Sequence, residues 1–173
     1  CTDGVETRYE LVHGELVEMP PESDENLSIA RKLLLELIQH LPPEWVVWGT
    51  EVEVTGKRVR CRLPDLLVHS AESKAAVAGA NRATLTRDMP PPALVIEVVS
   101  PGQANRDRDY RYKYAEYAAR GIGEYWIVDP ETRQVTLCQW NRGLYEDQIY
   151  TGADPIQSPI VPNFSLTPDD IFA

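Results

Sequence analysis

The chain has 173 residues, of which 43% are hydrophobic and 25% charged, with a formal net charge of −10 and a pI of about 4.8. This composition is typical of a globular protein, and the length predicts one domain over residues 1–173. No apolar run is long enough to span a bilayer, and residues 1–4 lack the features of a signal peptide, so we expect a cytoplasmic protein. The acidic balance argues against tight, nonspecific binding to nucleic acid.

Arginines nevertheless concentrate in two segments, residues 59–62 and 105–111. They allow a locally basic groove, although a mixed, solvated surface is the simpler interpretation for most of them. Three widely spaced cysteines form neither a CxxC pair nor a zinc pattern, and Cys61 and Cys138 are expected to be small buried hydrophobes. The three histidines are scattered, and we expect them to be structural or surface residues: His13, His40 and His69.

The N-terminal part predicts a hairpin and then a helix. Residues 9–12 and 15–19 flank a turn in which Gly14 supplies the positive φ. Ser23 is a good N-cap for a helix that runs to about Leu41, where two prolines stop it. The apolar face of this helix is expected to be buried: Ile29, Ala30, Leu33, Leu34, Leu37 and Leu41.

The middle of the chain predicts a second hairpin from the alternating runs 45–54 and 58–68. Residues 70–92 predict a long surface loop with one short helix. Residues 93–99 are nearly all apolar, as expected for a central strand covered on both faces. A helix over residues 105–120 follows, and Gly121 fits its C-terminal cap.

Residues 124–128 predict another strand, and residues 135–140 and 144–150 predict a further hairpin. A last helical turn should open at Thr167, with Pro168 at its first position. The strand–helix–strand unit over 95–127 implies parallel strands with a right-handed crossover. The sequence therefore predicts an α/β (α+β) fold, with one mixed central sheet flanked by helices and extra β-hairpins.

Two carboxylates fall on strand faces that are otherwise apolar. Asp65 alternates with Leu63 and Leu67, and Glu97 alternates with Val95 and Val99. An unpaired carboxylate on a buried face is costly unless a cation or donors meet it. Each acid alone has a simpler explanation, a turn residue after a proline for the first and an ion pair for the second. Together, on adjacent strands, they could hold Mg²⁺ with water and phosphate oxygens.

Lys113 is the third candidate. On the predicted helix it lies at the border of the apolar face, and its long stem could carry the ammonium to the sheet edge. Asp109, four residues earlier on the same side, could orient it. The alternative is an ordinary surface ion pair between the two.

The ordered motifs resemble a known family. Leu63-Pro64-Asp65 followed by Val95-Ile96-Glu97-Val98-Val99-Ser100-Pro101 resembles the PD-(D/E)XK nuclease signature. The set Asp109-x-x-x-Lys113-x-x-x-Tyr117-x-x-x-Gly121-x-x-Glu124-Tyr125-Trp126-x-x-Asp129-Pro130, with the opening hairpin from Tyr9 to Val17, is similar to the Uma-two family of restriction-endonuclease-like proteins. This resemblance spans nearly the whole chain.

The resemblance implies a restriction-endonuclease-like core and a metal-dependent phosphodiesterase site. Asp65 and Glu97 would bind Mg²⁺ or Mn²⁺, with the Val98 carbonyl as a third ligand. Lys113 would orient the attacking water or stabilise negative charge on the phosphorane. Glu15, in the family's GE motif, would be an additional acidic member. The implied partners are a DNA substrate and a second copy of the chain in a homodimer.

The chain departs from the family pattern at two positions. The signature lysine, two residues after the acid, is Val99 here, so Lys113 can replace it only if the helix brings it into the same cleft. Asn26 stands where relatives often carry a His.

Three hypotheses follow. The first is a Mg²⁺- or Mn²⁺-dependent DNA endonuclease. The second is a catalytically inactive nuclease-fold module that binds a partner, which Val99 and the acidic charge favour. The third is a two-carboxylate glycoside hydrolase, which ranks last because exposed aromatic rows for sugar stacking are missing and the lysine would be idle.

Overall fold

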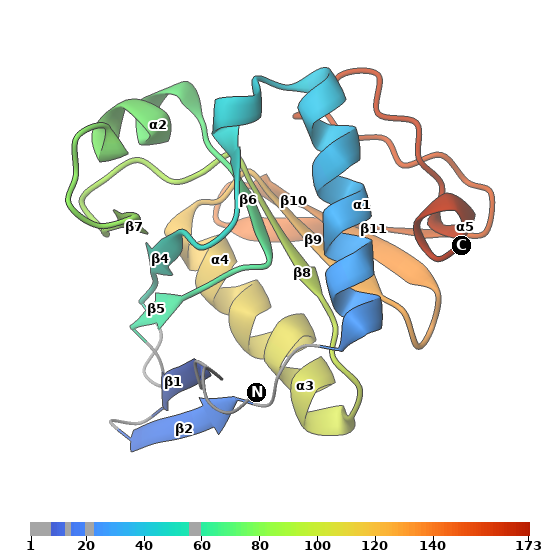
Figure 1. The fold of residues 1–173 in the computed structure, drawn as a ribbon, viewed down its shortest axis with the longest axis horizontal. Coiled ribbons are helices and arrows are strands. Elements are labelled where there is room, and N and C mark those ends of the chain that lie inside the picture. Colours follow the sequence, from blue (N-terminus) through green and yellow to red (C-terminus); the bar gives the residue numbers. More distant parts are fainter. Residues whose placement is uncertain (1–7, 13–14, 20–22, 56–59) are drawn as a thin grey trace, which may run out of the picture.

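A six-stranded mixed sheet is the centre of the fold (Figure 1). The computed structural model describes residues 8–12, 15–19, 23–55 and 60–173, with backbone alone for the first two ranges. The sheet runs in the order β11-β10-β9-β8-β6-β3, and only the β8–β9 pair is parallel within the described residues. The strands are β3 (Val46–Val47), β6 (Leu66–Val68), β8 (Leu94–Val98), β9 (Glu124–Asp129), β10 (Gln134–Asn141) and β11 (Leu144–Thr151).

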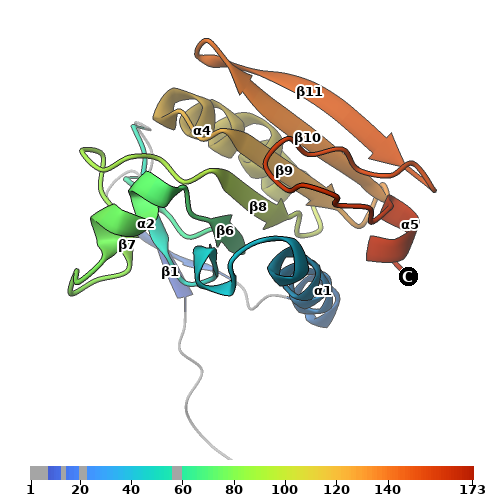
Figure 2. The same ribbon diagram turned by 90° about the horizontal axis from the view of Figure 1, so that it is seen from above.

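Helices cover both faces of this sheet (Figures 1 and 2). The first face packs on α1 (Asp24–His40) and the second on a helical segment made of α3 (Gln103–Asp107), η2 (Arg108–Lys113) and α4 (Tyr114–Arg120). Side chains of β8 alternate between the two layers, since Ile96 belongs to the α1 core and Val95 to the α4 core. The predicted central strand, covered on both faces, is therefore confirmed.

The helix α1 follows its sequence signals closely. The Ser23 side chain caps it by accepting a hydrogen bond from the backbone N–H of Asn26 at 3.1 Å. It ends at His40, ahead of the two prolines. Of the predicted apolar face, Ile29, Leu33 and Leu37 are buried, and the other members are partly buried against the same core.

The predicted second hairpin exists, but its strands are not continuous. The outer part is β4 (Glu51–Glu53) paired with β5 (Cys61–Arg62), and with β7 (Thr84–Leu85) it forms a separate three-stranded sheet. The inner part is the β3–β6 pair of the main sheet. The prediction of two continuous strands over 45–54 and 58–68 is wrong. Gly49, with a positive φ of 74°, interrupts the first strand, and Pro64, which has no N–H for the strand ladder, interrupts the second.

The remaining elements agree with the pattern in the sequence. The short helix within 70–92 is α2 (Ala71–Val77), while β7 was missed because a two-residue strand leaves no periodicity. The segment predicted as a helix over 105–120 begins at Gln103 and ends at Arg120, and its C-cap Gly121 has the left-handed φ of 76°. The parallel pairing of β8 with β9 is confirmed.

Both ends of the described chain also carry predicted elements. The antiparallel hairpin of β1 (Arg8–Val12) and β2 (Glu15–Met19) is present, although its turn at 13–14 lies outside the described residues. The short 3₁₀ turn η1 (Pro43–Trp45) precedes β3, and α5 (Pro168–Ile171) is capped by Thr167. Among the described residues, no helix has the length and apolarity needed to cross a membrane.

The two described cysteines differ in environment. Cys138 is fully buried on β10, as predicted, and burial raises the pKa of its thiol. Cys61 is only partly buried, because β5 belongs to the small sheet at the surface, so its assignment as a core residue was wrong.

We expect Leu33→Ala to lower the free energy of unfolding by about 2–5 kcal/mol, because Leu33 is fully buried between α1 and the sheet. Urea denaturation measures the loss. Leu35→Ala, on the same helix but 55% exposed, is the matched control and should change stability by about 0.5 kcal/mol or less. Equal losses in the two variants would contradict this packing of α1.

Candidate active site

Asp65 and Glu97 lie opposite each other at the ends of two paired strands. In the antiparallel register of β6 and β8, Leu66 faces Ile96 and Leu67 faces Val95. Extending that register by one residue places Asp65 across from Glu97, with both side chains on the α4 face of the sheet. The carboxylate of Asp65 also accepts a hydrogen bond from the backbone N–H of Val98 at 2.7 Å. This bond holds the aspartate against the end of β8.

Glu97 is buried, with 3% of its surface exposed, and two side chains meet its carboxylate. The Tyr117 hydroxyl donates to Oε1 at 2.7 Å, and the Lys113 ammonium lies 2.8 Å from Oε2. Burial raises the pKa of Glu97, an effect that Lys113 opposes and Asp109 strengthens. The predicted convergence of Lys113 on Glu97 is therefore present.

Lys113 is shared between two carboxylates. Besides Glu97, its Nζ contacts Asp109 Oδ1 at 2.9 Å, and only 7% of the residue is exposed. Burial alone would lower the pKa of Lys113, but the charges of Glu97 and Asp109 raise it above the ordinary value. Lys113 is accordingly a cation, suited to stabilise negative charge rather than to accept a proton.

A π-helical turn aligns the side chains that reach the site. Asp109, Lys113 and Tyr117 are spaced by four residues. In a regular α-helix each of these side chains would be rotated by about 40° around the helix axis relative to the one before it. The segment η2 (Arg108–Lys113) is a π-helix, whose wider turn offsets that drift. All three side chains therefore face the sheet, and each is at least nine-tenths buried. Such turns are often found at functional sites.

Asp109 is fully buried and only partly satisfied. Its Oδ1 accepts from Lys113 and, at 3.4 Å, from Arg108 Nε. Its Oδ2 has no hydrogen-bond partner among the residues that the structure describes. A buried carboxylate oxygen without a donor is unusual, and it marks this position as one with unmet bonding capacity.

The structure adds three residues around the site that the sequence did not assign to it. Tyr117, expected only on the apolar face, donates to Glu97, and burial raises its pKa well above 10, so it is a neutral donor. Arg62 on β5 forms a buried ion pair with Glu116 on α4, with Nε 2.7 Å from Oε2. In the sequence Arg62 is one arginine of the segment 59–62, and its pairing with Glu116 becomes visible only in the tertiary structure.

Asn26 connects α1 to the end of β8. Its buried side-chain amide lies 3.5 Å from the carbonyl oxygens of Val98 and Val99 and 3.3 Å from Ser100 Oγ. Val98, whose carbonyl was predicted as a metal ligand, thus contacts Asn26 at the start of α1 through that carbonyl and Asp65 through its N–H. Asn26 therefore contributes a hydrogen-bonding amide, not a titratable ring, at this point.

The oxygen donors at this point suit a hard divalent cation. Mg²⁺ is commonly held by one or two carboxylates, with water and phosphate oxygens completing an octahedron. Asp65, Glu97 and the Val98 carbonyl are donors of that kind, and the nearby Asp109 keeps one buried oxygen without a hydrogen-bond donor among the described residues. Among the described residues, no group of three or more His, Cys, Asp or Glu side chains is arranged to hold a metal ion, here or elsewhere, so a cation at this point would depend on the two carboxylates and the Val98 carbonyl.

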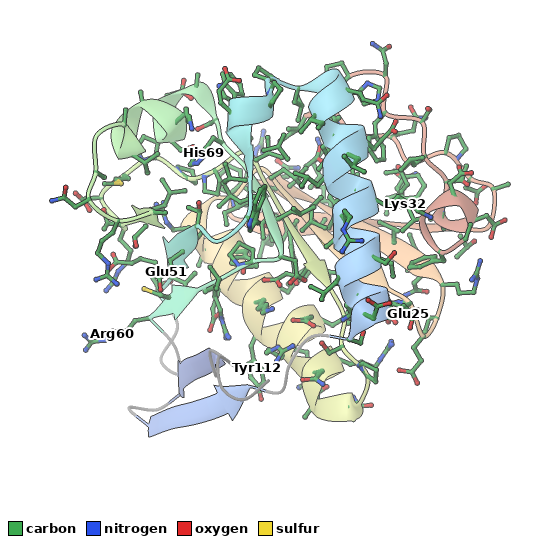
Figure 3. All side chains as sticks on the ribbon, viewed as in Figure 1. Glu25, Lys32, Glu51, Arg60, His69 and Tyr112 are labelled. Carbon is green, nitrogen blue, oxygen red and sulfur yellow. The ribbon has the colours of Figure 1, made fainter. Side chains whose placement is uncertain are left out.

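The other candidates lie away from this cluster or outside the described side chains. The backbone of Glu15 pairs with Val12 in the first hairpin, but its side chain is not among those described. His13 is also outside the described residues, and His40 pairs with Glu36 on α1. His69 lies beside α2, whereas Tyr112 marks the helical segment at the other end of the view (Figure 3).

His69 is a structural residue, buried and 3.0 Å from Ser73 Oγ. Burial, aided by Lys74, lowers its pKa from 6.5 to about 4. Between pH 6.5 and about 4, His69 is therefore protonated in the unfolded chain but neutral in the folded chain.

We expect the different protonation of His69 in the two states to lower the free energy of unfolding by about 3 kcal/mol as the pH drops from 6.5 to about 4. Urea denaturation across that range measures the slope. A His69→Gln variant should show a shallower slope, whatever its absolute stability. An unchanged slope in the variant would contradict a neutral, buried His69.

We expect Lys113→Met to lower the free energy of unfolding by about 3–5 kcal/mol, because it leaves two buried carboxylates without their cation. Arg111→Met is the matched control. Its side chain is 71% exposed and 3.8 Å from Asp107, so the change should cost about 0.5 kcal/mol or less. Chemical denaturation of both variants measures the difference, and similar losses would show that Lys113 is not held in the interior.

Comparisons with known proteins agree with this fold. The family model Uma2, described as "Putative restriction endonuclease", matches residues 1–169. A solved structure, described as a putative nuclease belonging to DUF820 from Anabaena variabilis, has a TM-score of 0.70 at 14% identity, covering 99% of this chain and 93% of that one. At this identity the likeness shows a shared fold. No curated protein matches the chain. Since the family model matches nearly all of its length, the chain belongs to the Uma2 family of restriction-endonuclease-like proteins.

Proposed function

We propose that the chain is a metal-dependent endodeoxyribonuclease, which hydrolyses phosphodiester bonds in DNA with Mg²⁺ or Mn²⁺. The observation that carries the proposal is the meeting of the buried Lys113 ammonium with Glu97, on the face that Asp65 shares. A binding module with a decayed site would have no need to bury this costly cluster. Membership of a family whose description is "Putative restriction endonuclease" supports the same class of reaction.

Asp65, Glu97 and the Val98 carbonyl would hold the cation. When bound, it would supply Lewis-acid activation of the phosphate and a more acidic water. Asp65, fixed by the Val98 N–H, would present its carboxylate without further rearrangement. Glu15 is proposed as an additional acid, contributed by the first hairpin.

Lys113 would act as a positive charge close to the reacting phosphate. In the hydrolysis, the water oxygen forms a bond to phosphorus and an ester P–O bond breaks. The water releases a proton to solvent, and the leaving oxygen takes one up. Negative charge grows on the non-bridging oxygens as this happens, and an ammonium held by Asp109 is well placed to stabilise it. The raised pKa of Lys113 favours this role over that of a base.

DNA is the proposed substrate despite the net charge of −10. Arg60, just before β5, and Arg111, on η2, are exposed, and Arg108 is partly exposed beside Asp109. Contacts from these arginines to phosphates would give salt-dependent binding at this surface. A homodimer would bring two such sites to one duplex, and we propose it as the species that cuts both strands.

The test is cleavage of supercoiled and single-stranded DNA in Mg²⁺ or Mn²⁺, with a chelator as the blank. Asp65→Asn should reduce cleavage by about 100-fold or more, because it removes a charged ligand at the reacting phosphate. Asp154→Asn, an exposed site outside the cluster, is the matched control and should keep wild-type activity.

Equal cleavage by the Asp65→Asn and wild-type proteins would refute the assignment. If the wild-type chain binds metal and DNA but does not cut, the inactive binding module is the correct alternative.

A further inference from the structure

Both oxygens of Glu97 are already engaged. Tyr117 donates to Oε1 and Lys113 lies against Oε2, at 2.7 and 2.8 Å. A dication on this carboxylate would therefore sit within a few ångströms of the ammonium. Because like charges repel strongly at such distances in a buried site, Lys113 and a bound cation would compete for Glu97.

Asp109 offers the lysine a second position. Its Oδ1 is already 2.9 Å from Nζ, so Lys113 can leave Glu97 without leaving its other carboxylate. The second oxygen, Oδ2, is buried and has no donor among the described residues. An ammonium has three N–H donors, so the one released from Glu97 is available for this oxygen.

The backbone around Asp109 is fixed enough to serve as that anchor. Its carbonyl accepts a hydrogen bond from the buried Tyr125 hydroxyl at 3.1 Å, which ties η2 to β9. Arg108 Nε also contacts Oδ1, so the carboxylate is oriented from its own helix. The side chain of Lys113 can thus turn by a small movement while its partner stays in place.

We propose that Asp109 is a positioning residue that receives Lys113 when a divalent cation takes Glu97. In the metal-free chain the lysine neutralises Glu97, and on metal binding it is withdrawn and held by Asp109, beside the reacting phosphate. This inference rests on the proposed metal-dependent function and adds the residue that sets the affinity for the metal.

A crystal structure of the unmodified chain with Mn²⁺ tests the movement directly. We expect Mn²⁺ on Asp65 and Glu97, with Nζ of Lys113 within hydrogen-bond distance of both Asp109 oxygens and out of contact with Glu97 Oε2. Mn²⁺ on Glu97 with Lys113 still bonded to Oε2 would overturn the inference and leave the proposed function standing. This readout depends on no variant.

Calorimetric titration with Mn²⁺ tests the energetic role. Asp109→Asn should weaken binding by about tenfold, because the amide cannot hold the displaced ammonium. Asp107→Asn, an equal charge change at a partly exposed position on the same helical segment, should alter affinity by about twofold or less.

The same Asp109→Asn change in a Lys113→Met background separates positioning from simple electrostatics. If Asp109 acts through Lys113, its loss should then change Mn²⁺ affinity by about twofold or less. If Asp109→Asn still lowers Mn²⁺ affinity about tenfold in the Lys113→Met background, Asp109 attracts the cation directly. That result would overturn the inference but not the proposed function. No Mn²⁺ binding by the wild-type chain would overturn both the inference and the proposed function.

Discussion

The constraint on which the site depends is the burial of Glu97 near the end of the central strand β8. A carboxylate with 3% exposure on β8 has to be met by donors and positive charge, or it becomes protonated. Tyr117 and Lys113 supply these from a helical segment that is far away in sequence, and Asp109 then balances the lysine. Each member of the cluster is buried because another member compensates it. The burial of Glu97 on the sheet therefore depends on the π turn, which positions Lys113 and Tyr117 against it, and on Asp109, which balances the lysine charge.

The helical segment over 103–120 does more than cover the sheet. A uniform α-helix would rotate Asp109 or Tyr117 away from β8, whereas the π turn keeps the stripe aligned. The chain lacks the signature lysine after the strand acid, since Val99 packs into the core instead. The Lys113 ammonium contacts the Glu97 carboxylate from the helical segment instead. Its position between Glu97 and Asp109 raises the pKa of Lys113 and keeps it charged. The site thereby holds an ammonium that is shared between Glu97 and Asp109.

Sequence patterns were informative where a single element decides the outcome. The cap and apolar face of α1, the left-handed Gly121 and the alternation that turns Glu97 inward are all local properties, and the structure confirms them. The division of the second hairpin between two sheets could not be predicted, because it depends on which neighbour each short strand finds. The role of Tyr117 was missed for a similar reason, since a tyrosine on an apolar stripe is indistinguishable from core until its hydroxyl meets a carboxylate.

By itself, the sequence determined the family, the order of the elements and the inward orientation of Glu97, since these follow from periodicity and from motifs of neighbouring residues; Asp65, beside the exposed Leu63, is only partly buried. Asp65 and Glu97 were identifiable in this way, because a charged residue on an apolar strand face needs an explanation. Only the tertiary structure decided where the ends of the long side chains lie. It placed Lys113 between Glu97 and Asp109, Asn26 against the Val98 carbonyl and Arg62 against Glu116. Apart from the Asp109–Lys113 pair, which lies within one helical segment, these contacts join different elements, and their geometry depends on packing that no local pattern encodes.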